Sequence, residues 1–315
     1  MTLVGSSKAD AMAVETAGFE GSFGDPGTGP EGAVAQATRP GPEAAEPSVS
    51  IVIPAKNEAR NLPNVLQKLP QDCELILVDG NSTDDTISVA QWLRPDITIV
   101  HQTRGGKGNA LACGFAAAKG DFIVMIDADG SNDPGEIPRF IDALKSGAHF
   151  AKGSRFIAGG GSDDITFIRR MGNYWLNKIV NVLYGTHYTD LCYGYNAFRR
   201  ECLDAMQLPA TDLKGEDGAM LWGDGFEVET LINVRIAKEG LRVAEVPSFE
   251  TARQYGASNL NAVSDGIRVL RTIHSERDAQ RRKAARGERK AARKAKVPAW
   301  SETDGALLHL GDEFS

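Results

Sequence analysis

The stretch FIVMIDADGSNDP, residues 122–134, carries the strongest structural signal in this chain. Its five apolar residues are followed at once by Asp127 and Asp129 and by a polar segment with Gly and Pro. Such a run predicts a buried strand of a mostly parallel sheet, and functional groups collect at the carboxyl ends of such strands. A hard cation held by one or two carboxylates leaves room for substrate phosphates. The pair therefore suggests an enzyme that handles a diphosphate through Mg2+ or Mn2+.

A calcium-binding loop and a solvated acidic turn are two other interpretations of this stretch. Acidic and hydroxyl side chains alternate from Asp127, as in a calcium-binding loop. Such a loop needs Gly at its sixth position and a carboxylate at its twelfth, where this chain has Asn132 and Pro138. A solvated acidic turn after a strand is the other interpretation, and the short motif alone does not exclude it.

The segments around this stretch alternate between strand and helix patterns. Apolar, mostly β-branched runs predict strands at 49–53, 74–78, 97–100, 122–126, 148–152 and 241–246. Helical spacing predicts helices at 57–69, 83–93, 105–119, from 134 onward, 166–184, 226–238 and 260–274. Helical segments of about 10–15 residues between short strands predict an α/β fold with a doubly wound, mostly parallel sheet and helices on both faces.

The ends of the chain differ in composition from its middle. Residues 1–46 are rich in Gly, Ala, Pro, Glu and Ser, so we expect a disordered arm. Residues 47–275 form the expected catalytic domain, and 276–315 form a basic tail that is partly helical or disordered. In the helix at 166–184, apolar residues recur on one face from Phe167 to Trp175 and beyond. We interpret this face as core packing, with a lipid- or partner-binding face as the alternative.

Composition narrows the class of protein. The formal net charge of -7 over 315 residues argues against general nucleic-acid binding. Four widely spaced cysteines without a Cys-x-x-Cys pair indicate reduced, buried thiols in a cytoplasmic protein. No apolar run approaches the roughly 18 residues that cross a bilayer, and the N-terminus lacks the apolar segment of a signal peptide.

Five motifs in order resemble those of one enzyme family, the family-two glycosyltransferases with the GT-A fold. The similarity is greatest to dolichyl- and polyprenyl-phosphate mannose or glucose synthases, and it covers about residues 48–274. The motifs are IVIPAKNEARNLP (51–63), LVDGNSTDDT (77–86), GGKGNAL (105–111), DADGSNDP (127–134) and RQYGASNL (253–260). Their order and spacing are far more specific than any one of them.

The resemblance implies a role for particular residues. Donor-binding residues would be Pro54, Ala55, Asn57, Glu58, Asp79, Lys107, Asp127, Ala128, Asp129, Arg253 and Ser258. Asp127 and Asp129 would hold the metal, and the catalytic set would add Arg155, Glu227, Glu229 and Arg253. Asp79 would accept a hydrogen bond from the base, or it forms a turn. Lys107 would reach a phosphate or stay a solvated loop lysine, and Arg155 would contact a phosphate or form a surface ion pair.

Three positions depart from the family pattern. The family often has Asp where this chain has Gly80, Gln where it has Ser131, and Lys where it has Asn259. These departures affect, in the same order, recognition of the base, a third metal ligand, and one contact to a phosphate or to the membrane.

The expected reaction is an inverting displacement that moves a hexose from GDP-mannose or UDP-glucose to a polyprenyl or dolichyl phosphate. An anionic phosphate acceptor needs cations beside it rather than a strong base. The alternative is a soluble enzyme acting on a hydroxyl of a glycan, protein or small molecule. That acceptor needs a carboxylate base, for which Asp224, Glu227 and Glu229 are available.

A basic run follows the last predicted helix. Residues 277–296 contain ten Lys or Arg against two acidic residues. Each basic residue near an anionic membrane contributes about 1 kcal/mol, so we expect this run to hold the enzyme peripherally at the cytoplasmic face of the membrane. A charged soluble tail is the alternative. Nucleic-acid binding is disfavoured by the acidic body and by the lack of interleaved basic and aromatic residues. A sugar-nucleotidyltransferase would need a Gly-rich, Arg-containing loop after the first strand, where this chain has PAKN.

Overall fold

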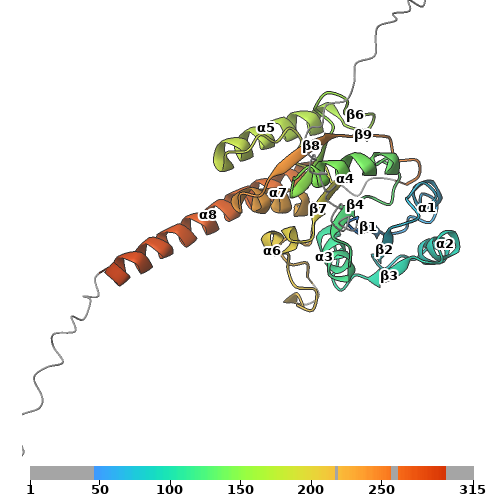
Figure 1. The fold of residues 1–315 in the computed structure, drawn as a ribbon, viewed down its shortest axis with the longest axis horizontal. Helices are drawn as coiled ribbons and strands as arrows, with labels where there is room; N and C mark the ends of the chain where they lie inside the picture. The colour runs from blue at the N-terminus through green and yellow to red at the C-terminus, as the bar shows by residue number, and fades with distance from the viewer. Residues whose placement is uncertain (1–45, 217–218, 257–261, 296–315) are drawn as a thin grey trace, which may run out of the picture. The chain divides into compact units, whose positions relative to one another are not determined.

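A computed structural model describes residues 46–216, 219–256 and 262–295. A seven-stranded sheet in the order β3-β2-β1-β4-β7-β5-β8 forms its centre (Figure 1). Within this sheet β7 alone runs antiparallel to its neighbours, β4 and β5. The strands are β1 Val49–Ala55, β2 Glu74–Asp79, β3 Thr98–His101, β4 Phe122–Met125, β5 Phe150–Ser154, β7 Asn196–Arg199 and β8 Val243–Pro247. Two short strands, β6 Gly161–Ser162 and β9 Phe249–Glu250, pair separately.

Helices cover both faces of the sheet, as expected for a doubly wound fold. One buried apolar cluster joins the sheet to α1, α2 and α4, and a second joins its other face to α3, α6 and α7. The helices are α1 Leu62–Leu66, α2 Thr86–Leu93, α3 Lys107–Ala117, α4 Ile137–Lys145, α5 Phe167–Tyr184, α6 Cys202–Met206, α7 Val228–Lys238 and α8 Ala262–Ala295, with a 3-10 turn η1 at Pro134–Glu136.

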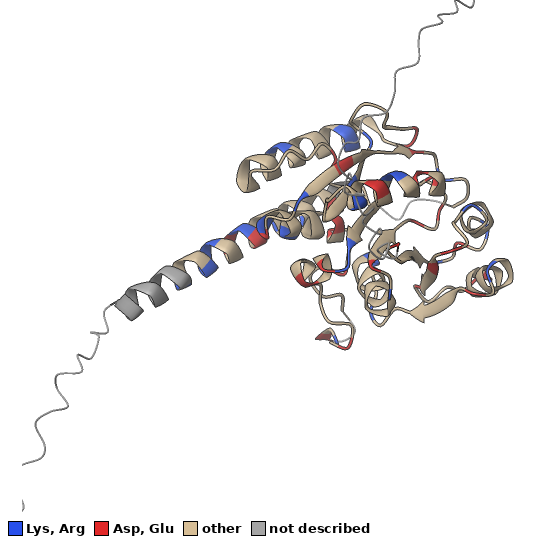
Figure 2. Cartoon of the chain, in the orientation of Figure 1, with Lys and Arg blue, Asp and Glu red and all other residues tan. Residues whose placement is uncertain are grey.

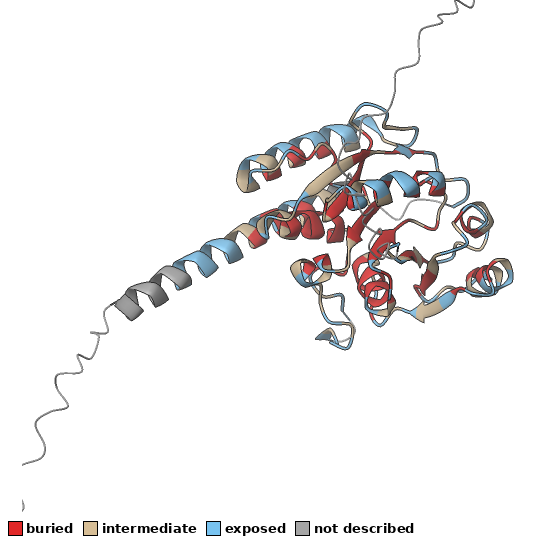
Figure 3. Cartoon of the chain, in the orientation of Figure 1, coloured by how far each residue is buried: buried red, intermediate tan, exposed pale blue. Residues whose placement is uncertain are grey.

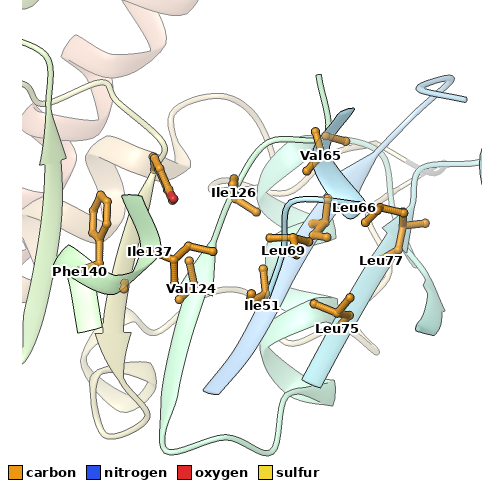
Figure 4. Packing of buried hydrophobic residues seen from close by; sticks show 14 of the residues in the cluster. Ile51, Val65, Leu66, Leu69, Leu75, Leu77, Val124, Ile126, Ile137 and Phe140 are labelled. Atoms are coloured by element: carbon orange, nitrogen blue, oxygen red, sulfur yellow. The ribbon is translucent and has the colours of Figure 1, made fainter. Parts of the chain in front are cut away.

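Successive side chains of a strand point to opposite faces of the sheet, so each strand contributes to both clusters. Ile51 and Ile53 face the first cluster, whereas Val52 between them faces the second. In the first cluster Ile51 and Val124 lie among the side chains of α1 and α4 (Figure 4). Each such side chain contributes about 1.5–3 kcal/mol when fully buried, so this packing holds the strand ends that carry the site in register.

The structure corrects the interpretation of the helix at 166–184. Phe167 and Trp175 are 76% and 60% exposed, while the buried positions of α5 are Asn173, Asn177 and Val180 (Figure 3). The prediction of core packing for the apolar face is therefore wrong. Its physical reason is that the asparagines bond the backbone of residues 188–192 and hold the opposite side of the helix inward.

Other differences are local. The helix expected at 57–69 is confined to α1, because residues 57–61 form a turn in which Asn57 has a φ of 58°. Helix α8 continues beyond the amphipathic stretch through the basic run to Ala295. The four cysteines are free; Cys113 and Cys202 are buried as expected, whereas Cys73 is half-buried and Cys192 is exposed. Of the described helices, none has the length and apolar character needed to cross a membrane.

Candidate active site

The loop after β4 fixes both aspartates of the fourth motif. The backbone N–H of Asp127 donates to Asn132 Oδ1 at 3.0 Å, and the N–H of Ser131 donates to Asp129 Oδ1 at 3.0 Å. Gly130, at φ 78°, allows the turn between them. Asn132 also donates to the Tyr193 hydroxyl. Its side chain is thus committed to the loop, which also argues against a calcium-binding loop.

Each aspartate lies against one cation from a distant motif. Lys107 Nζ is 2.7 Å from Asp127 Oδ1, and Arg253 Nη2 is 2.7 Å from Asp129 Oδ2. Each of the two carboxylates is therefore neutralised by one positively charged side chain. Within the described ranges no cluster of three or more His, Cys, Asp or Glu forms a complete metal cage. Two carboxylates suit Mg2+ or Mn2+, because these ions take further oxygens from phosphates and water.

Lys107 also binds a second carboxylate. Its Nζ lies 2.9 Å from Glu229 Oε1, which joins the first residue of α3 to the start of α7. Burial alone would lower the pKa of Lys107, but Asp127 and Glu229 raise it overall, so the lysine keeps its charge. Burial raises the pKa of Glu229, and Lys107 opposes that rise. The solvated-lysine alternative does not hold, because the Lys107 side chain is mostly buried.

The glycines of the third motif allow a close backbone contact inside the protein. A Cβ on Gly108 would lie 1.8 Å from the carbonyl oxygen of Gly223, and one on Gly106 would lie 2.1 Å from that of Asp224. The Gly108 N–H donates to the Asp224 carbonyl at 2.7 Å. These glycines let α3 begin directly against the loop before α7.

Arg253 brings the first and fourth motifs together. Its Nη1 lies 3.2 Å from Glu58 Oε1 while its Nη2 binds Asp129. Asn61 donates to Glu58 Oε2 at 2.6 Å and to the carbonyl of Tyr255 at 3.1 Å. Burial raises the pKa of Glu58, and Asn61 and Arg253 oppose that rise. The segment 253–255 is thus fastened over the start of the first motif.

The neighbouring ends of β1 and β2 carry the residues expected to bind the nucleotide. Pro54 and Ala55 pair with Val78 and Asp79 in the parallel ladder. Asp79 is buried, and its carboxylate accepts from the Ser82 N–H at 3.3 Å, as in the turn interpretation.

Asn57 and Gly80 complete this edge of the sheet. Asn57 Oδ1 accepts from the Thr83 N–H at 2.7 Å, which ties the first motif to the second. A Cβ on Gly80 would lie 3.1 Å from that of Lys56, so a larger residue there would press on the first motif.

The family model described as glycosyl transferase family 2 matches residues 50–206. Polyprenol monophosphomannose synthase of Mycolicibacterium smegmatis is 32% identical over 222 residues, which cover 67% of this chain and 80% of that protein. The chain belongs to glycosyl transferase family 2. Undecaprenyl-phosphate mannosyltransferase of Micrococcus luteus is 31% identical over 232 residues, covering 70% of this chain and 91% of that protein.

Solved structures agree on the fold of this glycosyltransferase. Glucosyl-3-phosphoglycerate synthase from Mycobacterium tuberculosis, in complex with Mn2+, UDP and phosphoglyceric acid, superposes with a TM-score of 0.56. The match covers 74% of this chain and 79% of that one at 22% identity. The predicted GT-A fold is therefore confirmed.

Arg155 occupies a different position in the glycosyltransferase from the one expected. It makes a two-point ion pair with Asp190, at 2.7 and 2.9 Å, and its Nη1 lies 2.9 Å from Glu250 Oε2. Its guanidinium also stacks on Tyr193 at 4.6 Å. All of this is buried, so a surface ion pair does not describe it. The structure assigns Arg155 to holding the segment 190–193 against β5 and β9.

Two of the three candidate bases are also committed elsewhere. Asp224 is buried in a two-point ion pair with Arg104, at 2.7 and 2.9 Å. Glu227 accepts from the backbone N–H groups of Gly223 and Gly225. Glu227 thus shapes the loop before α7, whereas Glu229 faces Lys107. Ser258, also expected at the site, lies outside the described residues.

Several residues at the site were not anticipated. His101, the last residue of β3, has its Nδ1 3.6 Å from Asp79 Oδ2, and Asn61 and Asn132 anchor the loops. His101 was detectable in principle, since it is polar and follows a predicted strand. The asparagine contacts carry no such signal because they depend on loop conformation.

Proposed function

We propose that this glycosyltransferase moves a hexose, with mannose the first candidate, from a nucleotide sugar to a polyprenyl phosphate, with a divalent metal and with inversion. The observation that carries this proposal is the pair Asp127 and Asp129 at the end of β4, each held against a cation. The names of the two bacterial relatives, a polyprenol monophosphomannose synthase and an undecaprenyl-phosphate mannosyltransferase, support the acceptor and the sugar.

The chain's own residues supply charge and position. A bound Mg2+ or Mn2+ would be held by Asp127 and Asp129 and would stabilise the leaving nucleoside diphosphate as a Lewis acid. Arg253 offers two donors in a fork that suits a phosphate, and Lys107 offers a buried point charge beside it. The edge formed by Ala55, Asn57 and Asp79 would hold the nucleoside.

The carboxylates favour a phosphate acceptor over a hydroxyl. Asp224 is bound to Arg104, Glu227 to two backbone N–H groups, and Glu229 to Lys107. All three carboxylates are buried and make at least one of these contacts, although Glu227 Oε2 has no hydrogen-bond partner among the described residues and lies 3.9 Å from Arg268 Nη1. A lipid phosphate is already anionic near neutral pH and requires neighbouring cations instead.

The basic run adds a membrane component to the proposal. Arg281, Arg282, Lys283 and Arg286 lie on exposed turns of α8, where blue segments follow one another along the helix (Figure 2). These charges would attract the cytoplasmic leaflet, where anionic lipids reside.

The test is product formation from tritiated GDP-mannose or UDP-glucose with Mg2+ or Mn2+ and a short polyprenyl phosphate, scored by butanol extraction. We expect extractable label from one donor, lost in Asp129→Asn and kept in Asp142→Asn, an exposed aspartate on α4. Metal-dependent donor hydrolysis without extractable label would reject the lipid phosphate and favour the hydroxyl acceptor.

A further inference from the structure

Helix α5 presents a continuous apolar surface to solvent. Exposed positions follow one another along its outer side (Figure 3). The α5 face, as we name it, consists of Phe167, Ile168, Met171, Tyr174, Trp175, Ile179 and Val182, all classed as exposed. Soluble proteins seldom leave so many large apolar side chains together in water unless the surface binds something.

Hydrogen bonds hold this face outward. Asn177 Nδ2 donates to the Thr189 carbonyl at 2.6 Å, and Asn181 Nδ2 donates to the Tyr188 carbonyl at 2.8 Å. Asn173 Oδ1 accepts from the Cys192 N–H at 3.3 Å. The inner side of α5 combines these asparagines with apolar residues, Val180 among them, that pack on a core shared with α7 and α8, while the α5 face points outward.

The charges around the α5 face are basic. The sequence of α5 contains Arg169, Arg170 and Lys178 and no acidic residue. Asp163 and Asp164 precede the helix, and Asp164 pairs with Arg169 at 2.9 Å. Arg170 and Lys178 are exposed, so the rim of the apolar face is positive.

Helix α8 packs beside α5 (Figure 1). Its own exposed side chains include Ile267, Leu270 and Arg271. Further along, the same helix enters the basic run.

We propose that the α5 face docks on an anionic lipid bilayer, with Trp175 and Phe167 in the headgroup region. A helix with aromatic and aliphatic residues on one face and basic residues at its rim is suited to the bilayer interface. A second copy docking through the same face would oppose Arg170 and Lys178 to their own symmetry mates, which like-charge repulsion disfavours. The expected membrane contact thus includes α5 as well as the basic run 277–296.

The docking surface is connected to the candidate active site by a short segment. The loop that α5 binds, 188–192, leads directly to Gly194. A Cβ on Gly194 would lie 3.0 Å from Lys107 Nζ and 3.2 Å from Glu229 Oε1. The segment 188–194 therefore links the α5 face to the Lys107–Glu229 pair. The link to a lipid acceptor rests on the proposed function, whereas the docking itself does not.

The experiment measures tryptophan quenching by brominated lipid in vesicles of phosphatidylglycerol and phosphatidylcholine, with flotation as a second readout. We expect the full-length protein to float with anionic vesicles and to be quenched. Trp175→Phe should lose most of the quenching, while Trp92→Phe, at a 79% exposed position on α2, should keep it. Trp175→Glu should lower the partition constant about tenfold or more, the loss expected for one large apolar side chain, while Trp92→Glu stays within about twofold.

Three results would overturn the proposal. They are equal partitioning of the two glutamate variants, absence of wild-type binding, and Trp175-dependent dimerisation in sedimentation without vesicle binding. Vesicle binding that depends on Trp175 without transfer to any polyprenyl phosphate would leave the docking surface standing and reject the proposed function. Transfer to a short, water-soluble polyprenyl phosphate without vesicle binding would support the proposed function and reject the docking surface.

Discussion

Replacing Lys107 with methionine tests the charge arrangement at the site. The lysine lies 2.7 Å from Asp127 and 2.9 Å from Glu229, so its loss leaves two carboxylates close together without a cation. Removing one partner of a buried ion pair costs about 3–5 kcal/mol. The Asp127 side chain is 31% exposed and retains some hydration. We therefore expect Lys107→Met to lose about 3 kcal/mol of folding stability, the lower end of that range.

The loss should depend on pH with a definite sign. Burial raises the pKa of Glu229, and Lys107 restrains that rise. Without the lysine the pKa rises further. A carboxyl whose folded pKa lies above its unfolded value of 4.5 stabilises the fold fully below that value, and the contribution is lost as pH rises through the folded pKa. The deficit of Lys107→Met should therefore be large near pH 8 and smaller near pH 5.

Urea unfolding followed by circular dichroism measures this deficit at both pH values. Lys119→Met is the control, since that side chain is 87% exposed, and it should change stability by no more than about 0.5 kcal/mol. Adding Glu229→Gln to Lys107→Met should recover most of the loss. A loss equal to that of the control, or no recovery in the double variant, would refute the reasoning.

Three further predictions concern packing and ion pairs. Gly108→Ala should lower the free energy of unfolding by about 3 kcal/mol or more, because its Cβ would meet a backbone oxygen at 1.8 Å. Gly172→Ala, which has open space around it in α5, should leave that free energy unchanged or raise it by up to about 1 kcal/mol. Equal melting temperatures of the two variants would contradict this prediction. Burial alone would raise the pKa of Glu276, but its bonds from two cations of α7 lower it overall, so its stabilisation is present above pH 4.5 and is lost as pH falls. Glu276→Gln should be destabilised near pH 7 and match the wild type near pH 3; a pH-independent gap would exclude the ion pair as the cause. Arg155→Lys should lose about 3 kcal/mol or more, since lysine cannot reproduce the two-point contact, and calorimetry showing wild-type stability would return Arg155 to consideration as a phosphate ligand.

The strands and the central aspartates were predictable because they depend on local sequence. Apolar runs identified the positions of β1 to β4, and the abrupt change at Asp127 marked the end of the last of these. Strand β7 was missed, since Asn196–Arg199 is short and has a polar residue at each end. It lies in the sheet because β4 and β5 flank it, which no local pattern reveals.

The orientation of side chains was less predictable than the positions of the elements. The period of α5 was evident, but the choice of its buried face depends on asparagine bonds to residues 188–192. Likewise, Arg155 and Glu227 are bound by partners that only the folded chain brings near them. Asp129 and Arg253, which the resemblance assigns to one site, lie in direct contact, and no local pattern predicts that contact.

Binding of Mn2+ in the presence of GDP or UDP, followed by electron paramagnetic resonance, examines the role of the aspartate pair itself. We predict that Asp127→Asn and Asp129→Asn each weaken Mn2+ binding by about tenfold or more, because even the loss of a residue that only supports a metal ligand has an effect of that size. Asp142→Asn should bind Mn2+ as the wild type does. If both site variants keep their fold and bind Mn2+ with wild-type affinity, the metal-binding role of the aspartate pair is contradicted. The aspartates would then serve only as partners of Lys107 and Arg253.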